Sequence, residues 1–440
     1  MYAPAQPGKK GIPRRSDFSF VSRQRHFDTA GMLHIAPRLN RIKPSPSSMA
    51  GQRARELRAM GRDILGLTAG EPDFETPMHI KDAAIRAMMA GQTRYTDVGG
   101  TPLLKEAIAG KLLRENALAY TPGEIIVGTG AKQVIFNALM CTVAAGDEVI
   151  VPAPYWVSYP DIALLAGGVP VFVDCPATAG FKLQPADLER AITGKTRWLM
   201  LNSPNNPSGA TYTRAELEAL AEVLRRHPQV WVLTDDIYEH LIYGDIAFAT
   251  MAQVAPDLKD RTLTVNGVSK AYAMTGWRIG YGAGPAALIK AMVKLQSQST
   301  SGPNSVAQAA AIAALTGPQD TIAANRREYQ ARRDTVVAAL NAIDGIRCDV
   351  PDGAFYVFAS CSALFGLRTH KGTVIETSDD WVMHLLDSQD LAALQGSAYG
   401  VPTHFRISFA ASNEQLLDGC RRIARARAEL SGQAINQEPQ

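Results

Sequence analysis

The residues of this chain with the clearest capacity for chemistry lie in the segment TVNGVSKAYAMTGWRIGY, residues 264–281. An apolar run there leads into the pair Ser269-Lys270, and Arg278 follows eight residues later. Apolar and aromatic neighbours disfavour the charged form of a lysine, so its pKa falls and its free amine can attack an aldehyde. Arg278 supplies a planar, permanently charged group that suits a phosphate. The segment predicts an enzyme that holds its cofactor on Lys270, although the same pattern also surrounds ordinary surface lysines.

A second segment, IIVGTGAKQVIFNAL at residues 125–139, has the pattern of a strand, a glycine turn and a helix. A helix N-terminus carries free N–H groups and the positive end of the helix dipole, and both favour a phosphate. Gly130, Ala131 and Lys132 would present those N–H groups. A dinucleotide site has less support, because the third glycine of GxGxxG is missing. By itself, such a turn is also compatible with a purely structural role.

Polar side chains follow two apolar runs that read as strands, WLML and VWVL. The carboxyl ends of parallel strands line the crevice where α/β proteins bind ligands, so these side chains are candidates for a binding site. Each has a simpler interpretation, since Asn-Pro forms turns and Asp-Asp caps helices. The candidates are Asn205, Asn206, Asp235, Asp236 and Tyr238.

The elements that must position these residues alternate between helix and strand, which predicts a mainly parallel sheet. A helix over residues 80–89 has its apolar residues on one face, and another is expected at 50–60. From about residue 325, a long charged helix, a turn-rich stretch and a last helix near 414–430 predict a separate α+β unit. The polar stretch 369–380 is expected to be a surface loop. The predicted strands include Glu148–Val151, Arg197–Leu201 and Val230–Leu233.

Composition limits the classes of protein that this chain can be. A chain of 440 residues, 46% hydrophobic and 20% charged, can bury a large core, and no apolar stretch reaches the length of a membrane span. Residues 1–31 carry a net charge of +4, which leaves −1 on the rest, so no nucleic-acid surface is expected. These residues are predicted to form a disordered basic extension. Five scattered cysteines without CxxC spacing predict reduced thiols, a cytoplasmic location and no metal site.

Taken together, these segments resemble the class I (fold type I) pyridoxal-phosphate-dependent aminotransferases, and most closely the bacterial aspartate aminotransferase subgroup. The resemblance extends from about Arg38 to the C-terminal helix and rests on GEPDFETP, AKQVIFN, YWVSYP and MTGWRIGY. It implies a large cofactor-binding domain at 76–319, with a mainly parallel seven-stranded sheet flanked by helices. It also implies a smaller α+β domain from both chain ends, with an N-terminal arm and part of that domain at 32–75 and the remainder at 320–440.

The resemblance also implies a role for each candidate residue in binding pyridoxal 5′-phosphate. Lys270 bonds covalently to the cofactor, Asp235 keeps a proton on the ring nitrogen, and Asn206 and Tyr238 bond the 3′-oxygen. Trp156 stacks on the ring. The phosphate is bound by Arg278, Ser269, the amides of Gly130 and Ala131, and Tyr95 of the partner subunit, so a homodimer with shared active sites is implied. One departure is Gly267, where the wider class often has a phosphate-binding serine.

Substrate binding is implied for a further set of residues. Arg406 matches the arginine that binds the substrate α-carboxylate, with Gly70, Trp156 and Asn206 alongside. In the resembled subgroup, a lysine at the place of Lys132 pairs with the substrate's distal carboxylate. A helix-start lysine can instead point into solvent, but a cation near a helix N-terminus is electrostatically disfavoured.

The expected reaction is therefore transamination, with aspartate and 2-oxoglutarate giving oxaloacetate and glutamate. Prephenate or aromatic amino acids are alternative substrates. A carbon–sulfur lyase or cyclopropane-forming synthase on the same fold would share Lys270, Asp235 and Arg278 but would not need Lys132. A cofactor-sensing regulator would need a DNA-binding module, and residues 1–31 are too short and too polar to form one.

Residues 1–31 are predicted to be dispensable, because they lack apolar periodicity and have little surface to bury. A variant that starts at Met32 should keep the melting temperature and the steady-state kinetics of the full chain. A fall in melting temperature of many degrees would show that the extension packs on the folded protein.

Overall fold

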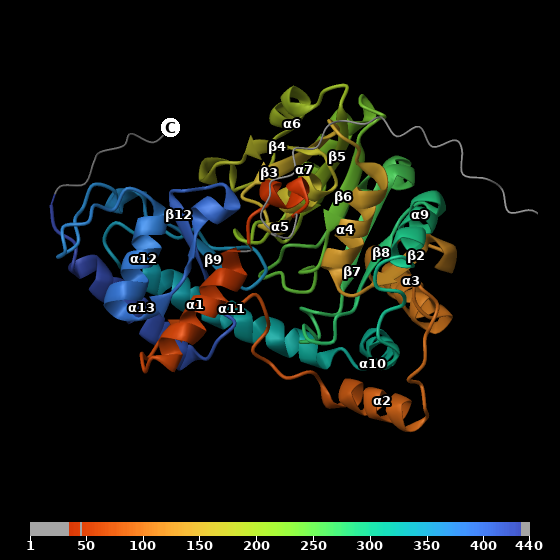
Figure 1. The fold of residues 1–440 in the computed structure, drawn as a ribbon, viewed down its shortest axis with the longest axis horizontal. Helices are drawn as coiled ribbons and strands as arrows, with labels where there is room; N and C mark the ends of the chain where they lie inside the picture. Colours follow the sequence, from red (N-terminus) through yellow and green to blue (C-terminus); the bar gives the residue numbers. More distant parts are fainter. Residues whose placement is uncertain (1–34, 45, 433–440) are drawn as a thin grey trace, which may run out of the picture. The chain divides into compact units, whose positions relative to one another are not determined.

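The computed structural model describes residues 35–44 and 46–432 (Figure 1). The predicted basic extension at 1–31 lies outside the described residues. From Arg38 onward, the described part of the chain forms one compact unit.

The central element is a sheet of seven strands in the order β2-β8-β7-β6-β5-β3-β4. β8 is antiparallel to both of its neighbours, and the other strands run parallel to one another. The prediction of a mainly parallel seven-stranded sheet is therefore confirmed. The strands are β2 (Ile125–Gly128), β3 (Glu148–Ala153), β4 (Val169–Asp174), β5 (Thr196–Asn202), β6 (Trp231–Asp235), β7 (Thr262–Gly267) and β8 (Gly280–Ala283).

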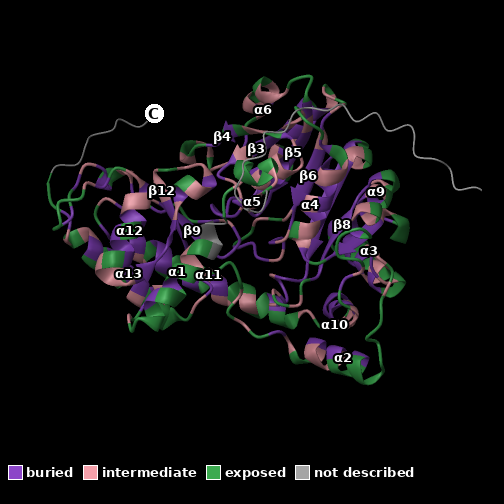
Figure 2. Ribbon diagram, in the orientation of Figure 1, coloured by how far each residue is buried: buried purple, intermediate pink, exposed green. Residues whose placement is uncertain are grey.

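Helices cover both faces of this sheet, which explains why its inner strands are apolar at successive positions rather than at alternate ones. In β3, Val149 and Val151 pack with α4, α5 and α9, whereas Ile150 packs with α7 on the opposite face. Figure 2 shows the inner strands as buried along their length. The helices of this part are α2 (Met78–Met89), α3 (Pro102–Asn116), α4 (Ala131–Thr142), α5 (Ser158–Leu165), α6 (Pro185–Ala191), α7 (Arg214–Arg225), α8 (Met251–Val254), α9 (Ala286–Gln296) and α10 (Ser305–Thr316).

A second, smaller group of elements combines both ends of the described chain. Leu65 and Gly66 of β1 pair with Leu391 and Ala392 of β10, and a separate antiparallel sheet has the order β11-β12-β9. The long helix α11 packs against β9 and α13. These elements are α1 (Pro46–Ala59), β1 (Leu65–Gly66), α11 (Asp320–Asn341), β9 (Tyr356–Ser360), α12 (Ser378–Gln389), β10 (Leu391–Ala392), β11 (Leu394–Gln395), β12 (His404–Ser408) and α13 (Asn413–Ala428).

This arrangement is consistent with a large and a small domain, and the boundaries at 32–75, 76–319 and 320–440 stay a prediction. Short 3-10 helices complete the fold at Pro37–Arg41, Pro122–Glu124, Ala177–Ala179, Pro256–Arg261, Ser362–Leu364 and Gly396–Tyr399. Within residues 35–44 and 46–432, no helix has the length and apolar character needed to cross a membrane.

The expectation of a surface loop over 369–380 is wrong at its C-terminal end, where α12 begins at Ser378. The reason is a capping box. The Thr377 hydroxyl accepts a hydrogen bond from the Asp380 N–H, and the Asp380 carboxylate accepts one from the Thr377 N–H at 2.9 Å. Such reciprocal bonds satisfy N–H groups that a helix start leaves free. The sequence contains the capping-box signature at Thr377 and Asp380, but the polar composition of the stretch favoured the interpretation as a loop.

Candidate active site

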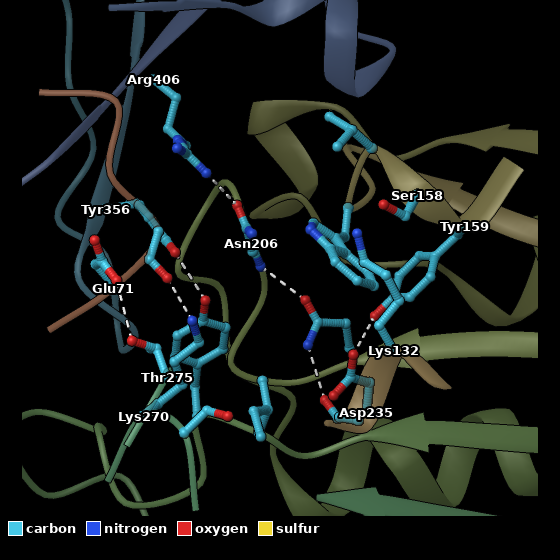
Figure 3. A pocket seen from close by; sticks show the side chains of 18 of the residues that line it. Glu71, Lys132, Ser158, Tyr159, Asn206, Asp235, Lys270, Thr275, Tyr356 and Arg406 are labelled. Carbon is cyan, nitrogen blue, oxygen red and sulfur yellow. Dashed lines mark hydrogen bonds between the residues drawn. The ribbon is translucent and has the colours of Figure 1, made fainter. Parts of the chain in front are cut away.

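A cavity of about 380 Å³ lies where β5, β6 and β7 end at their carboxyl ends (Figure 3). Arg406 and Glu71 lie on one side of it, and Asp235 and Tyr159 lie on the other. The lining residues come from many segments between Gly70 and Arg406, so parts of the chain that are distant in sequence line the same cavity. The sequence-predicted residues on the cavity wall are Gly70, Ala131, Lys132, Trp156, Asn206, Asp235, Tyr238, Ser269, Lys270, Arg278 and Arg406.

Lys270 has the buried surroundings that the sequence predicts. Its ammonium donates to the carbonyl oxygen of Gly70 and lies 5.9 Å from the ring centroid of Tyr238 and 5.8 Å from that of Phe355. Burial lowers the pKa of Lys270 from 10.5 to about 8, because the charged form loses its solvation. About a tenth of this amine is therefore a free nucleophile at pH 7, whereas at the ordinary pKa of 10.5 the fraction is below about a thousandth.

Asp235, the last residue of β6, is also buried, but burial has the opposite consequence for a carboxyl group. It raises the pKa of Asp235 to about 6, and the hydrogen bond from the Tyr159 hydroxyl, 2.8 Å from Oδ2, works against that rise. Oδ1 is buried and has no hydrogen-bond partner among the described residues. Because an unpaired buried acceptor is costly, Oδ1 is suited to receive a ligand N–H.

Arg406 of β12 lies on the small-sheet side of the cavity. Its Nη1 donates to Asn206 Oδ1 at 2.9 Å and its Nη2 donates to the Thr68 carbonyl at 2.7 Å. The guanidinium carbon lies 4.2 Å from the centroid of the Tyr356 ring. Nε is buried and has no partner among the described residues. Arg406 is thus held in place with donor capacity to spare, as binding a carboxylate requires.

The hydroxyl of Tyr238 meets the hydroxyl of Tyr356 at 2.8 Å. Asn206 is fixed by its own backbone N–H, which donates to Asn202 Oδ1 at 2.8 Å. Tyr238 and Asn206 therefore present a hydroxyl and an amide to the same cavity from loops that follow adjacent strands.

The start of α4 is suited to bind an anion. This anion seat consists of Gly130, the N–H groups of Ala131 and Lys132, and Arg278. Gly130 precedes the helix with φ +86°, and a Cβ at this position would overlap the Arg278 guanidinium. Arg278 is held by its Nη1, which donates to the Thr275 carbonyl at 2.8 Å. The first N–H groups of a helix have no intrahelical partners, so those of Ala131 and Lys132 reinforce the positive charge of Arg278.

The structure gives a physical reason for Gly267, where the wider class often has a serine. β7 and β8 bring Gly267 opposite Gly280, and a Cβ on Gly267 would lie 3.0 Å from both Gly280 Cα and the Ile279 carbonyl oxygen. A Cβ on Gly280 would overlap the backbone of Ala131. The two glycines allow β7 and β8 to pack directly against the anion seat.

Lys132 occupies the cavity side of the first turn of α4. The residue is largely exposed, yet its ammonium lies 4.7 Å from the centroid of the Trp156 ring. This partial withdrawal from water, together with the charge of Arg278, lowers the pKa of Lys132, and Asp161 opposes the effect. Trp156 itself packs edge to face against Tyr159, with centroids 5.3 Å apart.

Four of the candidate residues do not line the cavity, namely Gly130, Asn205, Asp236 and Tyr95. Tyr95 is the most exposed of them. Its side chain is 99% exposed, and it does not line the cavity wall.

Several residues on the wall were not predicted from the sequence. Tyr159 had a usable signal, because it lies only three residues after Trp156, in the first turn of α5. Tyr356 and Glu71 had none, since their roles arise from contacts with Tyr238 and with Thr275, whose hydroxyl donates to Glu71 at 3.0 Å.

The family follows from comparison with known proteins. The sequence model described as aminotransferase class I and II matches residues 62–423. The chain belongs to this family. Class I and II aminotransferases transfer an amino group between an amino acid and a 2-oxo acid with pyridoxal 5′-phosphate as cofactor.

Individual relatives cover nearly the whole aminotransferase. A probable aspartate/prephenate aminotransferase of Rhizobium leguminosarum bv. phaseoli is 57% identical over 394 residues, which are 90% of this chain and 98% of that protein. The crystal structure of the aspartate aminotransferase from Rhizobium meliloti has a TM-score of 0.89 at 52% identity and covers 91% of this chain and 100% of its own. The aspartate aminotransferase from Thermus thermophilus with maleate has a TM-score of 0.84 at 42% identity, covering 90% of this chain and 100% of that one.

The residues of the aminotransferase fit pyridoxal 5′-phosphate on three observations. The unpaired Oδ1 of Asp235 suits a protonated ring nitrogen, and the anion seat at Gly130 and Arg278 suits a phosphate. The amine of Lys270, with its lowered pKa, suits an aldehyde. All three groups contact one cavity or its rim.

The pKa of Lys270 predicts how the apoenzyme takes up its cofactor. Only the unprotonated amine bonds to the aldehyde, so the rate of covalent uptake should rise about tenfold per pH unit below pH 8 and level off above it. Visible absorbance after mixing apoenzyme with pyridoxal 5′-phosphate measures this rate. Lys270→Ala, which can bind the cofactor only noncovalently, is the control. A rate that levels off only near 10.5, the ordinary value for lysine, would contradict the prediction.

Proposed function

We propose that this aminotransferase uses dicarboxylic substrates, converting aspartate and 2-oxoglutarate to oxaloacetate and glutamate. The observation that carries the proposal is that the cavity wall has two cationic side chains, Lys132 and Arg406, in addition to Lys270 and Arg278, which are suited to the cofactor. Arg406 would bind the α-carboxylate and Lys132 the distal carboxylate. Among the described residues, Lys132 has no hydrogen-bond or salt-bridge partner, and its ammonium lies over the Trp156 ring.

The relatives support the choice of an acidic substrate. The name of the Rhizobium leguminosarum relative includes aspartate and prephenate, and the Thermus structure contains maleate, a dicarboxylate. Prephenate is the second candidate, because it too has two carboxylates and that relative carries its name. A lyase or synthase reaction on the same fold has no support from these names.

When bound, pyridoxal 5′-phosphate acts as an electron sink that stabilises negative charge at the substrate α-carbon. The roles of the protein residues follow from their chemistry. Asp235 would face the ring nitrogen and keep it protonated, since a neighbouring carboxylate favours the charged form. Tyr238 and Asn206 would bond the 3′-oxygen, Trp156 would stack on the ring, and Ser269 would join the anion seat in binding the phosphate.

Lys270 would move the proton between the substrate α-carbon and the cofactor carbon. A general base must be close to the proton and must be unprotonated at the working pH, and the lowered pKa of Lys270 provides the second condition. Arg406 would orient the substrate for this step. Its two charge-assisted hydrogen bonds to a carboxylate are worth roughly 1.5–3 kcal/mol each, and Gly70 lies alongside.

We also propose that the active unit is a homodimer in which Tyr95 of the partner subunit completes each site. The near-complete exposure of Tyr95 in the single chain leaves its side chain free to contact a partner subunit. α2 exposes further apolar side chains close by in the sequence, at Met78, Ile85, Met88 and Met89. An isologous dimer is the commonest closed assembly and would cover such a surface.

A cytoplasmic location is proposed on the state of the cysteines. All five are free thiols in the structure, and four of them are buried. Free thiols are typical of reducing compartments.

Hybrid dimers test the shared site. Mixing Tyr95→Ala with Lys270→Ala, each inactive alone, should restore about a quarter of wild-type activity, because half of randomly formed dimers are hybrids with one intact site. Mixing Asp235→Ala with Lys270→Ala is the control and should restore nothing, since both residues serve the site of their own chain. Equal recovery in the two mixtures, or an active species that sediments as a monomer, would refute the shared site.

Lys132 tests the substrate class. Lys132→Ala should lower kcat/KM for aspartate about ten- to a hundred-fold more than for phenylalanine, because one charge-assisted contact of roughly 1.5–3 kcal/mol is lost only with aspartate. Lys132→Met, which keeps the length of the side chain and removes its charge, should give the same selective loss. Steady-state assays with aspartate, prephenate, phenylalanine and alanine measure it. Equal losses for aspartate and phenylalanine would show that Lys132 supports the fold or the phosphate instead.

A further inference from the structure

A buried charged network lies next to Tyr238 of the active site, outside the cavity wall. The proposed reaction does not use it. Its centre is the carboxylate of Glu239, whose side chain is 5% exposed. Lys111 of α3, with a side chain 1% exposed, donates to Glu239 Oε1 and also to Asn116 Oδ1 at 2.8 Å. Burial opposes ionisation of Glu239, but the charges of Lys111 and His240 outweigh it and the pKa ends below its ordinary value.

Two asparagines complete the hydrogen bonding of this carboxylate. Asn266 Nδ2 donates to Glu239 Oε1 at 2.8 Å, and Asn116 Nδ2 donates to Oε2 at 2.9 Å. The two bonds are nearly equal in length and go to the same acceptor group, but they come from different elements. Asn116 ends α3, whereas Asn266 lies in β7.

The position of Asn266 links the network to the reacting groups. Glu239 follows Tyr238 directly, and its segment begins with Asp235 at the end of β6. Asn266 precedes Lys270 by four residues, and its Oδ1 accepts from the N–H of Gly267 at 2.7 Å. The bond between Asn266 and Glu239 therefore ties the segment that carries Asp235 and Tyr238 to the segment that carries Lys270.

An outer layer of charge surrounds this centre. Glu115 Oε2 lies 2.9 Å from His240 Nε2 and 3.5 Å from Lys111 Nζ. Burial opposes the ionisation of Glu115, but His240, Lys111 and Arg114 lower its pKa to about 2. Glu115, Glu239 and His240 have the spacing of metal ligands, yet the ammonium of Lys111 already supplies a positive charge at this point.

A buried ion pair is a weak source of stability, because the cost of removing two charges from water offsets their attraction. What such a network does provide is a fixed geometry, since each of its polar atoms must keep its partner. Misplacement of a reacting group by about 1 Å can cost roughly a hundred-fold in rate. A hydrogen bond that links two segments is therefore most important where both carry groups that act on one ligand. Here those groups are Lys270, Asp235 and Tyr238.

We propose that Asn266 is a positioning residue, which holds Lys270 in register with Asp235 and Tyr238 through its hydrogen bond to Glu239. The inference rests on the roles given to those three residues in the proposed function. Asn116 makes the equivalent bond to the same carboxylate without joining a catalytic segment. It is therefore the matched control for a purely structural contribution.

The experiment compares Asn266→Leu with Asn116→Leu, because leucine has the same branched skeleton of side-chain heavy atoms as asparagine and no hydrogen-bonding group. Both variants should lower the melting temperature of the apoenzyme by similar amounts. Asn266→Leu should also lower kcat for aspartate at least about tenfold with little change in KM, and should shift the pH at which the visible absorbance of the bound cofactor changes. Asn116→Leu should keep kcat within about twofold and leave that pH unchanged. If Asn266→Leu does not fold, Asn266→Ser and Asn116→Ser are compared by the same measurements.

Similar losses of kcat in the two variants, or an unchanged absorbance profile in the Asn266 variant, would overturn the inference and leave a stabilising role alone. The wild-type enzyme in the same assay separates this result from a failure of the proposed function. A wild-type protein with no aspartate activity would overturn the function, whereas an active wild type with indistinguishable variants would overturn only the role of Asn266.

Discussion

An amine that must attack an aldehyde near neutral pH has to be withdrawn from water, and Lys270 imposes this requirement on the surrounding structure. Its pKa of about 8 results chiefly from burial among the residues of the cavity wall. The same burial raises the pKa of Asp235 to about 6, although this carboxyl group is useful only when ionised. The hydrogen bond from Tyr159 offsets part of that rise. One low-dielectric site thus favours a neutral lysine, while local hydrogen bonding helps to keep a charged aspartate.

The two sheets contribute different halves of the site. Elements of the large sheet supply the groups suited to the cofactor, from the anion seat at Gly130 to Asp235 and Lys270. The small sheet supplies Arg406, and the N-terminal segment supplies the carbonyl of Thr68 that holds it. Because Arg406 also bonds to Asn206, the groups suited to the cofactor and to the substrate carboxylate are connected by one hydrogen bond. The separation explains how one cofactor site can be combined with different substrate sites in a fold.

The proposed selectivity for a second carboxylate would follow from an unfavourable placement of charge. Lys132 puts a cation at the start of α4, where the helix dipole disfavours it. Partial burial and the charge of Arg278 lower the pKa of Lys132. The Trp156 ring offers it a partial partner at 4.7 Å. An anionic substrate group would relieve this repulsion. On this proposal, the fold would hold Lys132 in place for the distal carboxylate before the substrate binds.

Local patterns in the sequence were enough to predict the alternation of helices and strands and the anion seat. Apolar runs that end in Asn206 or Asp235 and a glycine turn that starts a helix are such patterns. Gly70, Trp156 and Arg406 were expected only from the resemblance to a family. Only the tertiary structure placed Tyr356 beneath Arg406 and Tyr159 against Asp235, and only it joined Asn266 to Glu239 and Lys111. Such contacts join residues far apart in the chain and leave no periodicity or spacing to read. Local sequence encodes backbone geometry and burial, whereas the partners of a buried polar group are decided by which elements pack together.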